Sequence, residues 1–230
     1  MNTYRLIQGD CLEVLPKLNK VHLIIADPPY STPVITAYGR KKEKNYGDLS
    51  IQKRFFIELR KSFENIIKEQ SAVFIFCDAK YYPVLFEAFY QWSTTQLLVW
   101  DKMRIGLGSP FRPRYELIYF LSPDYGLHFK NKTWYPNILK FKPVPSNKRL
   151  IGSQKPMILI TTLIKAFTNE GDTVLDPFMG SGTTMEACQH TNRSCIGIEI
   201  NQKYCDVIKK RCFDRTFLDR DVEYSFEELA

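Results

Sequence analysis

The sequence predicts an α/β fold built on a doubly wound, mostly parallel β-sheet. The chain has 230 residues, which suits one large domain, and 44% of them are hydrophobic, enough to fill its core. Short apolar runs alternate with runs of helical periodicity along most of the chain. Two of the apolar runs break into loops rich in proline or glycine, which is typical of ligand loops at the carboxyl edge of a parallel sheet.

Short apolar runs bounded by turn residues are the predicted strands. They cover residues 4–8, 21–26, 72–77, 96–100, 116–121, 173–175 and 194–198. Segments with apolar residues at helical spacing are the predicted helices. They cover residues 11–18, 51–68, 82–90, 156–167, 183–190 and 202–212. Pro156 suits the first turn of its helix, where no amide hydrogen is needed. Residues 173–212 then form a β-α-β-α unit.

The chain is expected to form a single domain that spans residues 1–230. Three of its segments do not follow the alternation of strands and helices. Residues 31–50 carry a basic run without periodicity and are expected to form a mobile loop. Residues 122–153 are aromatic, basic and broken by prolines. Residues 213–230 hold six acidic and two basic residues and are interpreted as an acidic C-terminal tail.

The net charge of +7 lies on the body of the chain, which carries about +11 once the acidic tail is set aside. A basic body is consistent with a nucleic-acid partner, although most basic residues on any protein are solvated surface. Arg112 and Arg114 are expected to hold phosphates, or alternatively to pair with Glu116. The other candidate nucleic-acid-binding residues are Arg40, Lys41, Lys42, Lys148 and Arg149.

Several classes of protein are disfavoured by composition. No apolar run approaches the length needed to cross a membrane, and the first residues lack a signal-peptide core, so a cytoplasmic protein without membrane contact is expected. The six cysteines are scattered without a Cys-x-x-Cys pair, which favours reduced thiols and predicts neither a metal site nor a disulfide framework.

The first proline-rich loop reads Asp27-Pro28-Pro29-Tyr30 and follows the strand 21–26. A carboxylate, rigid carbonyls and an aromatic face suit a planar base that carries an exocyclic amine. Asp27 and the carbonyl of Pro28 are candidates to accept the two amine hydrogens, while Tyr30 stacks on a base that has left the duplex. The structural alternative is a Pro-Pro turn in which Asp27 caps the backbone.

The second loop, residues 176–184, joins a strand to a helix and contains Asp176, Gly180, Gly182 and Thr183. Its glycines permit a tight turn and close approach of backbone to a bound nucleoside. Glu199 ends the next strand, where an acid can accept both ribose hydroxyls. The loop lacks Gly-Lys-Ser/Thr and Gly-x-Gly-x-x-Gly, which disfavours phosphate-loop and nicotinamide sites. Together the two loops indicate methyl transfer from S-adenosylmethionine (AdoMet).

These elements resemble a known family, the permuted β group of amino-methyltransferases of restriction-modification systems. In that arrangement the Asp-Pro-Pro-Tyr loop precedes a target-recognition region, here 122–153, and the cofactor loop comes last. The resemblance extends to about Cys212 and includes Gly9-Asp10, Gln154-Lys155-Pro156 and the run from Gly197 to Asn201. It implies a Rossmann-like AdoMet-dependent fold in which Asp10 contacts the adenine of the cofactor and Lys155 its methionine end. The remaining cofactor residues expected from these motifs are Cys11, Phe178 and Asn201.

The resulting prediction is a site-specific methyltransferase that acts on the N6 amine of adenine in double-stranded DNA, by base flipping and direct attack. Cytosine N4 is the alternative acceptor, although the family tends to carry serine at the position of Asp27 for cytosine. RNA and a protein glutamine amide are more distant acceptors, and a non-catalytic nucleic-acid-binding module is the alternative from another class. A second copy of the chain and a cognate restriction endonuclease are the further partners that the family suggests.

Overall fold

The computed structural model describes residues 1–29, 49–107, 110–123, 135–214 and 222–229. In this part of the chain nine strands form one sheet in the order β6-β4-β5-β3-β2-β7-β8-β1-β9, and only β5 runs antiparallel to its neighbours. The strands are β1 (Asn2–Gln8), β2 (Val21–Ala26), β3 (Ile67–Cys77), β4 (Thr94–Asp101), β5 (Tyr115–Ser122), β6 (Ile138–Lys140), β7 (Thr173–Asp176), β8 (Ser194–Glu199) and β9 (Val222–Glu228). The predicted mostly parallel α/β fold is confirmed.

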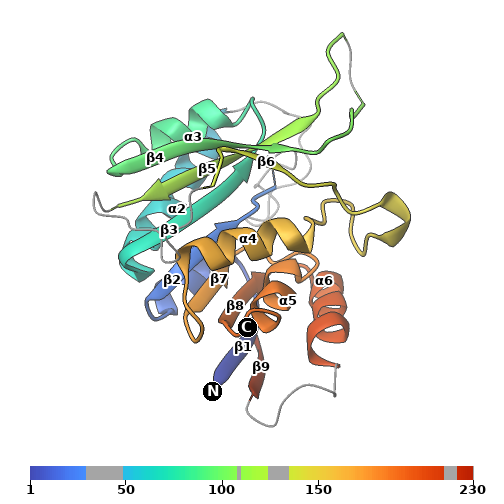
Figure 1. Ribbon diagram of the computed structural model, residues 1–230. Coiled ribbons are helices and arrows are strands. Elements are labelled where there is room, and N and C mark those ends of the chain that lie inside the picture. Colours follow the sequence, from blue (N-terminus) through green and yellow to red (C-terminus); the bar gives the residue numbers. More distant parts are fainter. Residues whose placement is uncertain (30–48, 108–109, 124–134, 215–221, 230) are drawn as a thin grey trace.

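Helices cover both faces of this sheet (Figure 1). The α-helices are α1 (Cys11–Val14), α2 (Leu49–Ile66), α3 (Tyr82–Phe89), α4 (Met157–Phe167), α5 (Thr183–Gln189) and α6 (Gln202–Ile208). Short 3₁₀ turns occur at Leu15–Lys17 and Ser146–Lys148, and a π-helical turn, η4 (Lys209–Phe213), follows α6. Successive strand residues alternate between the two cores, so Ile24 packs on the side of α2 while Leu23 and Ile25 pack on the side of α4.

Two strands occur where none was predicted. β9 lies within the segment interpreted as an acidic tail, and it pairs in parallel with β1 at the edge of the sheet. Glu227 of β9 forms an ion pair with Arg5 of β1, at 2.5 Å between Oε1 and Nε. Acidic side chains on an edge strand face solvent or a neighbouring basic side chain. The sequence of β9 therefore lacks the apolar pattern by which a strand is predicted. β6 is a three-residue strand within the segment 122–153 and pairs with β4.

Other differences are confined to element ends. The predicted loop 31–50 lies outside the described residues up to position 48, and its last two residues belong to α2. The predicted helix 202–212 changes to a π-helical turn over its last residues. All six cysteines are buried free thiols. Among the described residues, no helix is both long and apolar enough to cross a membrane.

Candidate active site

A pocket of about 600 Å³ lies at the carboxyl edge of the sheet, where β1, β2, β7 and β8 end. Its volume falls in the usual range for small-molecule sites, about 300–1,000 Å³. Both loops singled out in the sequence line it, although they are nearly 150 positions apart. The predicted site residues that line the pocket are Asp10, Cys11, Asp27, Pro28, Pro29, Lys155, Asp176, Phe178, Gly180, Thr183, Glu199 and Asn201.

The loop between β7 and α5 is organised by the buried Asp176 carboxylate. The amide of Phe178 donates to Oδ1 at 2.9 Å, and the Thr184 hydroxyl donates to Oδ2 at 2.5 Å. Burial raises the pKa of Asp176 to about 7, the two hydrogen bonds oppose this, and the charges of Asp27 and Glu199 add to it. Asp176 is therefore partly protonated near neutral pH.

Two glycines give this loop its shape. Gly180 and Gly182 adopt φ values of +55° and +79°, the left-handed region that glycine enters without strain. Gly182 is not among the residues that line the pocket. It caps α5, and a Cβ added there would meet Cys212 Sγ and Ile208 Cγ1 at 3.3 Å. Gly182 therefore permits close packing against the end of α6.

Glu199 at the end of β8 links two loops. Its Oε2 accepts from the amide of Gly180 and its Oε1 from the amide of Asn201, both at 2.8 Å. Burial raises the pKa of Glu199, against the effect of these backbone donors. Asp10 follows β1, the strand beside β8 in the sheet. Its Oδ1 accepts from the amide of Leu12 at 2.8 Å and so caps α1. Both carboxylates thus shape the pocket wall that they line.

Asp27 belongs to a chain of four charged side chains, two acids and two lysines. The Lys155 ammonium lies 2.7 Å from Asp27 Oδ2 and 2.7 Å from Glu116 Oε1, and Lys102 Nζ lies 2.8 Å from Glu116 Oε2. Burial opposes the charge of Glu116 and of Lys155, but the neighbouring charges outweigh it, so the pKa of Glu116 is lowered and that of Lys155 raised. Glu116 and Lys155 therefore stay ionised at neutral pH.

The four predicted nucleic-acid-binding residues that the structure describes do not line this pocket. Arg114 pairs with Asp101, at 2.7 and 2.8 Å, so the predicted alternative of a pair with Glu116 is wrong. Arg112 donates to the carbonyl of Gly106. Arg149 donates to the carbonyls of Val144 and Gly152, and Lys148 is exposed in a 3₁₀ turn. Tyr30, Arg40, Lys41 and Lys42 lie outside the described residues.

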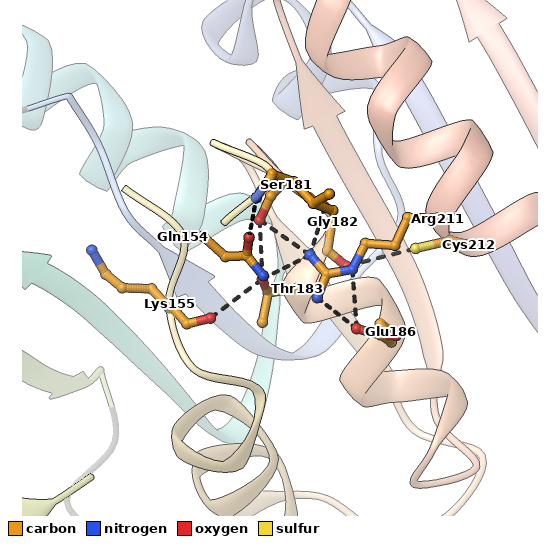
Figure 2. A network of polar contacts seen from close by, with 9 residues as sticks. Gln154, Lys155, Ser181, Gly182, Thr183, Glu186, Arg211 and Cys212 are labelled. Carbon is orange, nitrogen blue, oxygen red and sulfur yellow. Dashed lines mark hydrogen bonds and ion pairs between the residues drawn. The ribbon is translucent and has the colours of Figure 1, made fainter. Parts of the chain in front are cut away.

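Arg211, which is not among the predicted site residues, braces the loop between β7 and α5 (Figure 2). Its Nη1 donates to the Ser181 carbonyl at 2.8 Å and to Thr183 Oγ1 at 3.1 Å. Its Nε and Nη2 both bind Glu186 Oε2, and the side chains of this ion pair are only 10% exposed. Arg211 lies in the π-helical turn η4, and turns of this kind occur often at functional sites. The sequence around it reads as ordinary helix, so no local signal marks it.

The fold and the pocket define an AdoMet-dependent methyltransferase, in which an acidic pocket at the sheet edge is lined by the glycine loop and the Pro-Pro loop. The chain belongs to the DNA methylase family of the N6/N4 type, whose sequence pattern matches residues 21–210. The resemblance predicted from the motifs is thereby confirmed. AdoMet is the cofactor of this family, as predicted.

Curated relatives match over most of the chain. Type II methyltransferase M.HpaI of Haemophilus parainfluenzae is 29% identical over 240 residues, which cover 90% of this chain and 73% of the relative. DNA adenine methyltransferase YhdJ of Escherichia coli is 28% identical over 262 residues, which cover 98% of this chain and 86% of the relative.

Solved structures agree with these matches. The M1.HpyAVI–SAM complex is 26% identical, with a TM-score of 0.67 over 90% of this chain and 99% of that chain. The cytosine-N4-specific PvuII DNA methyltransferase has a TM-score of 0.77 over 97% of this chain and 89% of that chain. At 18% identity, the PvuII structure shows the shared fold alone.

Replacing Arg211 with methionine is expected to destabilise the protein by roughly 3 kcal/mol, because it leaves the buried Glu186 carboxylate without its cation. The double variant Arg211→Met/Glu186→Met removes both charges and should recover most of that stability. It still lacks the bonds to Ser181 and Thr183, so AdoMet should bind more weakly to both variants. Thermal unfolding and calorimetric titration measure the two effects separately. Wild-type AdoMet affinity in the double variant would show that the loop does not depend on Arg211.

Proposed function

We propose that the protein transfers a methyl group from AdoMet to the N6 amine of adenine at a specific site in double-stranded DNA, after the base has been flipped out of the duplex. The observation that carries the proposal is the position of the Asp27 carboxylate and the Pro28–Pro29 turn in one pocket with the glycine loop. The aspartate at the first position of the motif favours adenine, and the name of the relative YhdJ supports the same acceptor.

The residues of the pocket account for the reactivity of a poorly nucleophilic amine. The lone pair of an adenine amine is delocalised into the ring, so the nitrogen attacks only when it becomes pyramidal. An Asp27 oxygen and the Pro28 carbonyl accept its two hydrogens, and these bonds strengthen as positive charge grows on the nitrogen. The bound cofactor supplies a methyl group on a positively charged sulfur. The new N–C bond forms as the S–C bond breaks, the S–C electron pair stays on sulfur, and the extra amine proton leaves afterwards.

Lys155 orients the Asp27 carboxylate as an acceptor for the amine hydrogen. The family resemblance implies that Lys155 contacts the methionine end of the cofactor, and in the structure its ammonium lies 2.7 Å from Asp27 Oδ2 and 2.7 Å from Glu116 Oε1. The ammonium fixes the orientation of the Asp27 carboxylate and favours its ionised form. We infer that Lys155 acts on the acceptor side of the pocket as well as on the cofactor.

Acidic side chains on three strand ends form the cofactor side of the pocket. We infer that Glu199 accepts from the ribose hydroxyls, that Asp10 contacts the adenine of AdoMet, and that Asp176 orients its polar groups. A carboxylate oxygen that accepts one backbone hydrogen retains a second lone pair, so the bonds within the protein are compatible with these contacts. The cofactor also carries positive charge, which matches this acidic wall.

The pKa of Asp176 predicts that AdoMet binding depends on pH. A positively charged ligand favours the ionised carboxylate, so AdoMet affinity should rise about tenfold between pH 6 and pH 8 as a group with a pKa of about 7 loses its proton. Calorimetric titration at pH 6, 7 and 8 measures this change. Asp176→Asn should bind AdoMet more weakly and with little pH dependence. A flat profile in the wild-type protein would contradict the assignment.

The raised pKa of Asp176 also makes the stability of the folded protein depend on pH. The folded pKa of Asp176 is raised above its unfolded value of about 3.9, so the folded state binds the extra proton between about pH 4 and pH 7. The stability contributed by this group is therefore present at acid pH and is lost as the pH rises through 7. The cofactor-free Asp176→Asn variant should accordingly gain thermal stability relative to wild type at pH 8 and not at pH 4.

Cytosine N4 is the second candidate acceptor, because the same two hydrogen-bond acceptors suit either exocyclic amine. One experiment separates the candidates. The protein is incubated with labelled AdoMet and duplex DNA, and the DNA is digested to nucleosides. Label in N6-methyl-2′-deoxyadenosine supports the proposal, and label in N4-methyl-2′-deoxycytidine replaces it with the alternative. Absence of label from both, with AdoMet bound, would indicate a non-catalytic nucleic-acid-binding module.

The name of the relative M.HpaI supports a restriction-modification role, in which methylation protects DNA from a cognate endonuclease acting on the same site. We also infer that residues 122–153 read the recognition sequence within a single domain, and that two copies of the chain associate. Sequencing of methylated DNA from cells that express the protein identifies the site. Sedimentation of the purified protein tests the dimer.

A further inference from the structure

The connection between β4 and β5, described at residues 102–107 and 110–114, extends beyond the sheet as a hairpin and projects from the body at the upper right of Figure 1. Its stem is ordered by main-chain bonds from Lys102 to the Arg114 carbonyl at 2.9 Å and from Gly106 to the Pro113 carbonyl at 2.7 Å. Arg112 Nε donates to the carbonyl of Gly106 at 2.7 Å. The described parts of the hairpin therefore form a structured projection.

The described residues of the hairpin carry large apolar side chains in solvent. Leu107 is 91% exposed and Phe111 is 93% exposed, whereas Phe86 on α3 is 49% exposed. Ile105 and Met103 lie exposed on the same hairpin. Nearly complete exposure of neighbouring apolar side chains is unfavourable in the isolated protein and is typical of a binding surface.

Basic residues accompany these side chains, with Arg104 and Arg112 exposed on the same projection. Apolar groups flanked by arginines suit a duplex, in which phosphates lie on either side of stacked bases. The charge therefore favours DNA over an uncharged or basic protein surface as the occupant.

The hairpin also lies on the side of the molecule where Asp27 is found. β4 and β2 run parallel, because each lies antiparallel, directly or through β3, to β5. Their carboxyl ends consequently share one edge of the sheet, with the hairpin following β4 and Asp27 following β2. Lys102 at the base of the hairpin joins Asp27 through Glu116 and Lys155.

We propose that this hairpin enters the DNA duplex beside the target base through its described residues, with Phe111 and Leu107 inserted into the base stack and Arg104 and Arg112 on the flanking phosphates. Flipping a base unpairs and unstacks it, and apolar side chains that fill the space it leaves offset that cost. The inference rests on the proposed action on double-stranded DNA and is independent of which base is methylated.

The test compares Phe111→Ser and Leu107→Ser with the control variant Phe86→Ser, whose side chain is exposed on α3. The duplex contains the methylated site identified by sequencing, with 2-aminopurine as a fluorescent reporter of flipping beside or at the target base. We expect the hairpin variants to lose the flipping signal and to bind the duplex about 10- to 100-fold more weakly, the range for loss of a buried large apolar side chain. The control variant should match wild type, and AdoMet affinity should be unchanged in all three.

A second substrate identifies the step that the hairpin supports. In a duplex with the target base unpaired by a mismatch, flipping costs less, so methylation by Phe111→Ser should recover towards the wild-type rate. Arg104→Gln should lower the dependence of DNA affinity on salt by about one phosphate contact, whereas Phe111→Ser should leave that dependence unchanged.

Wild-type flipping and DNA affinity in Phe111→Ser/Leu107→Ser would overturn the insertion. A change in oligomeric state in these variants would also overturn it, since it would assign the hairpin to a subunit interface. Failure of the proposed function gives a different result, namely no labelled nucleoside with the wild-type protein.

Discussion

Replacing Asp27 with alanine is expected to reduce methyl transfer by about 100- to 1,000-fold or more, while AdoMet affinity stays within a few fold of wild type. The reason is that Asp27 accepts a hydrogen from the amine as charge develops on nitrogen, and loss of one such acceptor commonly lowers kcat by about that factor. Single-turnover methylation of duplex DNA measures the chemical step, and calorimetry measures cofactor binding.

The variant is interpretable because Lys155 keeps its second partner. In Asp27→Ala the Lys155 ammonium still lies against Glu116, so the buried cation is not left alone. Asp27→Asn provides the matched comparison, since it retains shape and one carbonyl oxygen but no charge, and its activity should lie between those of Asp27→Ala and wild type. Glu87→Ala, at an exposed carboxylate on α3, serves as the control. Methylation at the wild-type rate in Asp27→Ala would refute the assigned role.

The elements that carry the site were predictable because each has a local signature. The strand before Asp27 is apolar and buried except at the half-buried His22, and the Pro-Pro pair that follows cannot continue a ladder. Gly180 and Gly182 mark a turn that needs positive φ, as the structure shows. Once both loops were placed after parallel strands, their meeting at one edge followed from the topology.

The features that were missed depend on contacts between distant segments. β9 is a strand because β1 offers an open edge, and Val222–Glu228 alone does not show this. Arg211 reads as a helix residue, and its partners Ser181 and Glu186 lie 30 and 25 positions away. The alternative prediction pairs Arg114 with Glu116, its near neighbour in sequence, whereas the register sets Asp101 opposite Tyr115 and the Arg114 side chain binds Asp101. Periodicity and motif order do not encode such pairings.

Replacing Lys155 with methionine is expected to have the largest effect on stability, a loss of roughly 3–5 kcal/mol, together with loss of methyl transfer. The ammonium is buried and lies 2.7 Å from oxygens of both Asp27 and Glu116. Its removal takes from both carboxylates the cation that they share, while Glu116 keeps its contact with Lys102. Urea or thermal unfolding measures the loss, and the methylation assay follows activity.

The dependence of this loss on pH distinguishes charge from packing. In wild type the lysines lower the pKa of Glu116, so its favourable contribution is present above its unfolded pKa and disappears in acid. Without Lys155 the pKa of Glu116 should rise, and the variant should lose stability as the pH increases from about 4 to 8. Lys155→Met/Glu116→Gln removes the repulsion and should recover stability at pH 8, while activity stays low because Asp27 has lost its orienting cation. The Lys155 ammonium also lies over the ring of Phe76. If Lys155→Met were equally destabilised at pH 4 and pH 8, the lysine would act through packing against Phe76. The ion pairs of Lys155 would then not govern the acceptor side of the pocket.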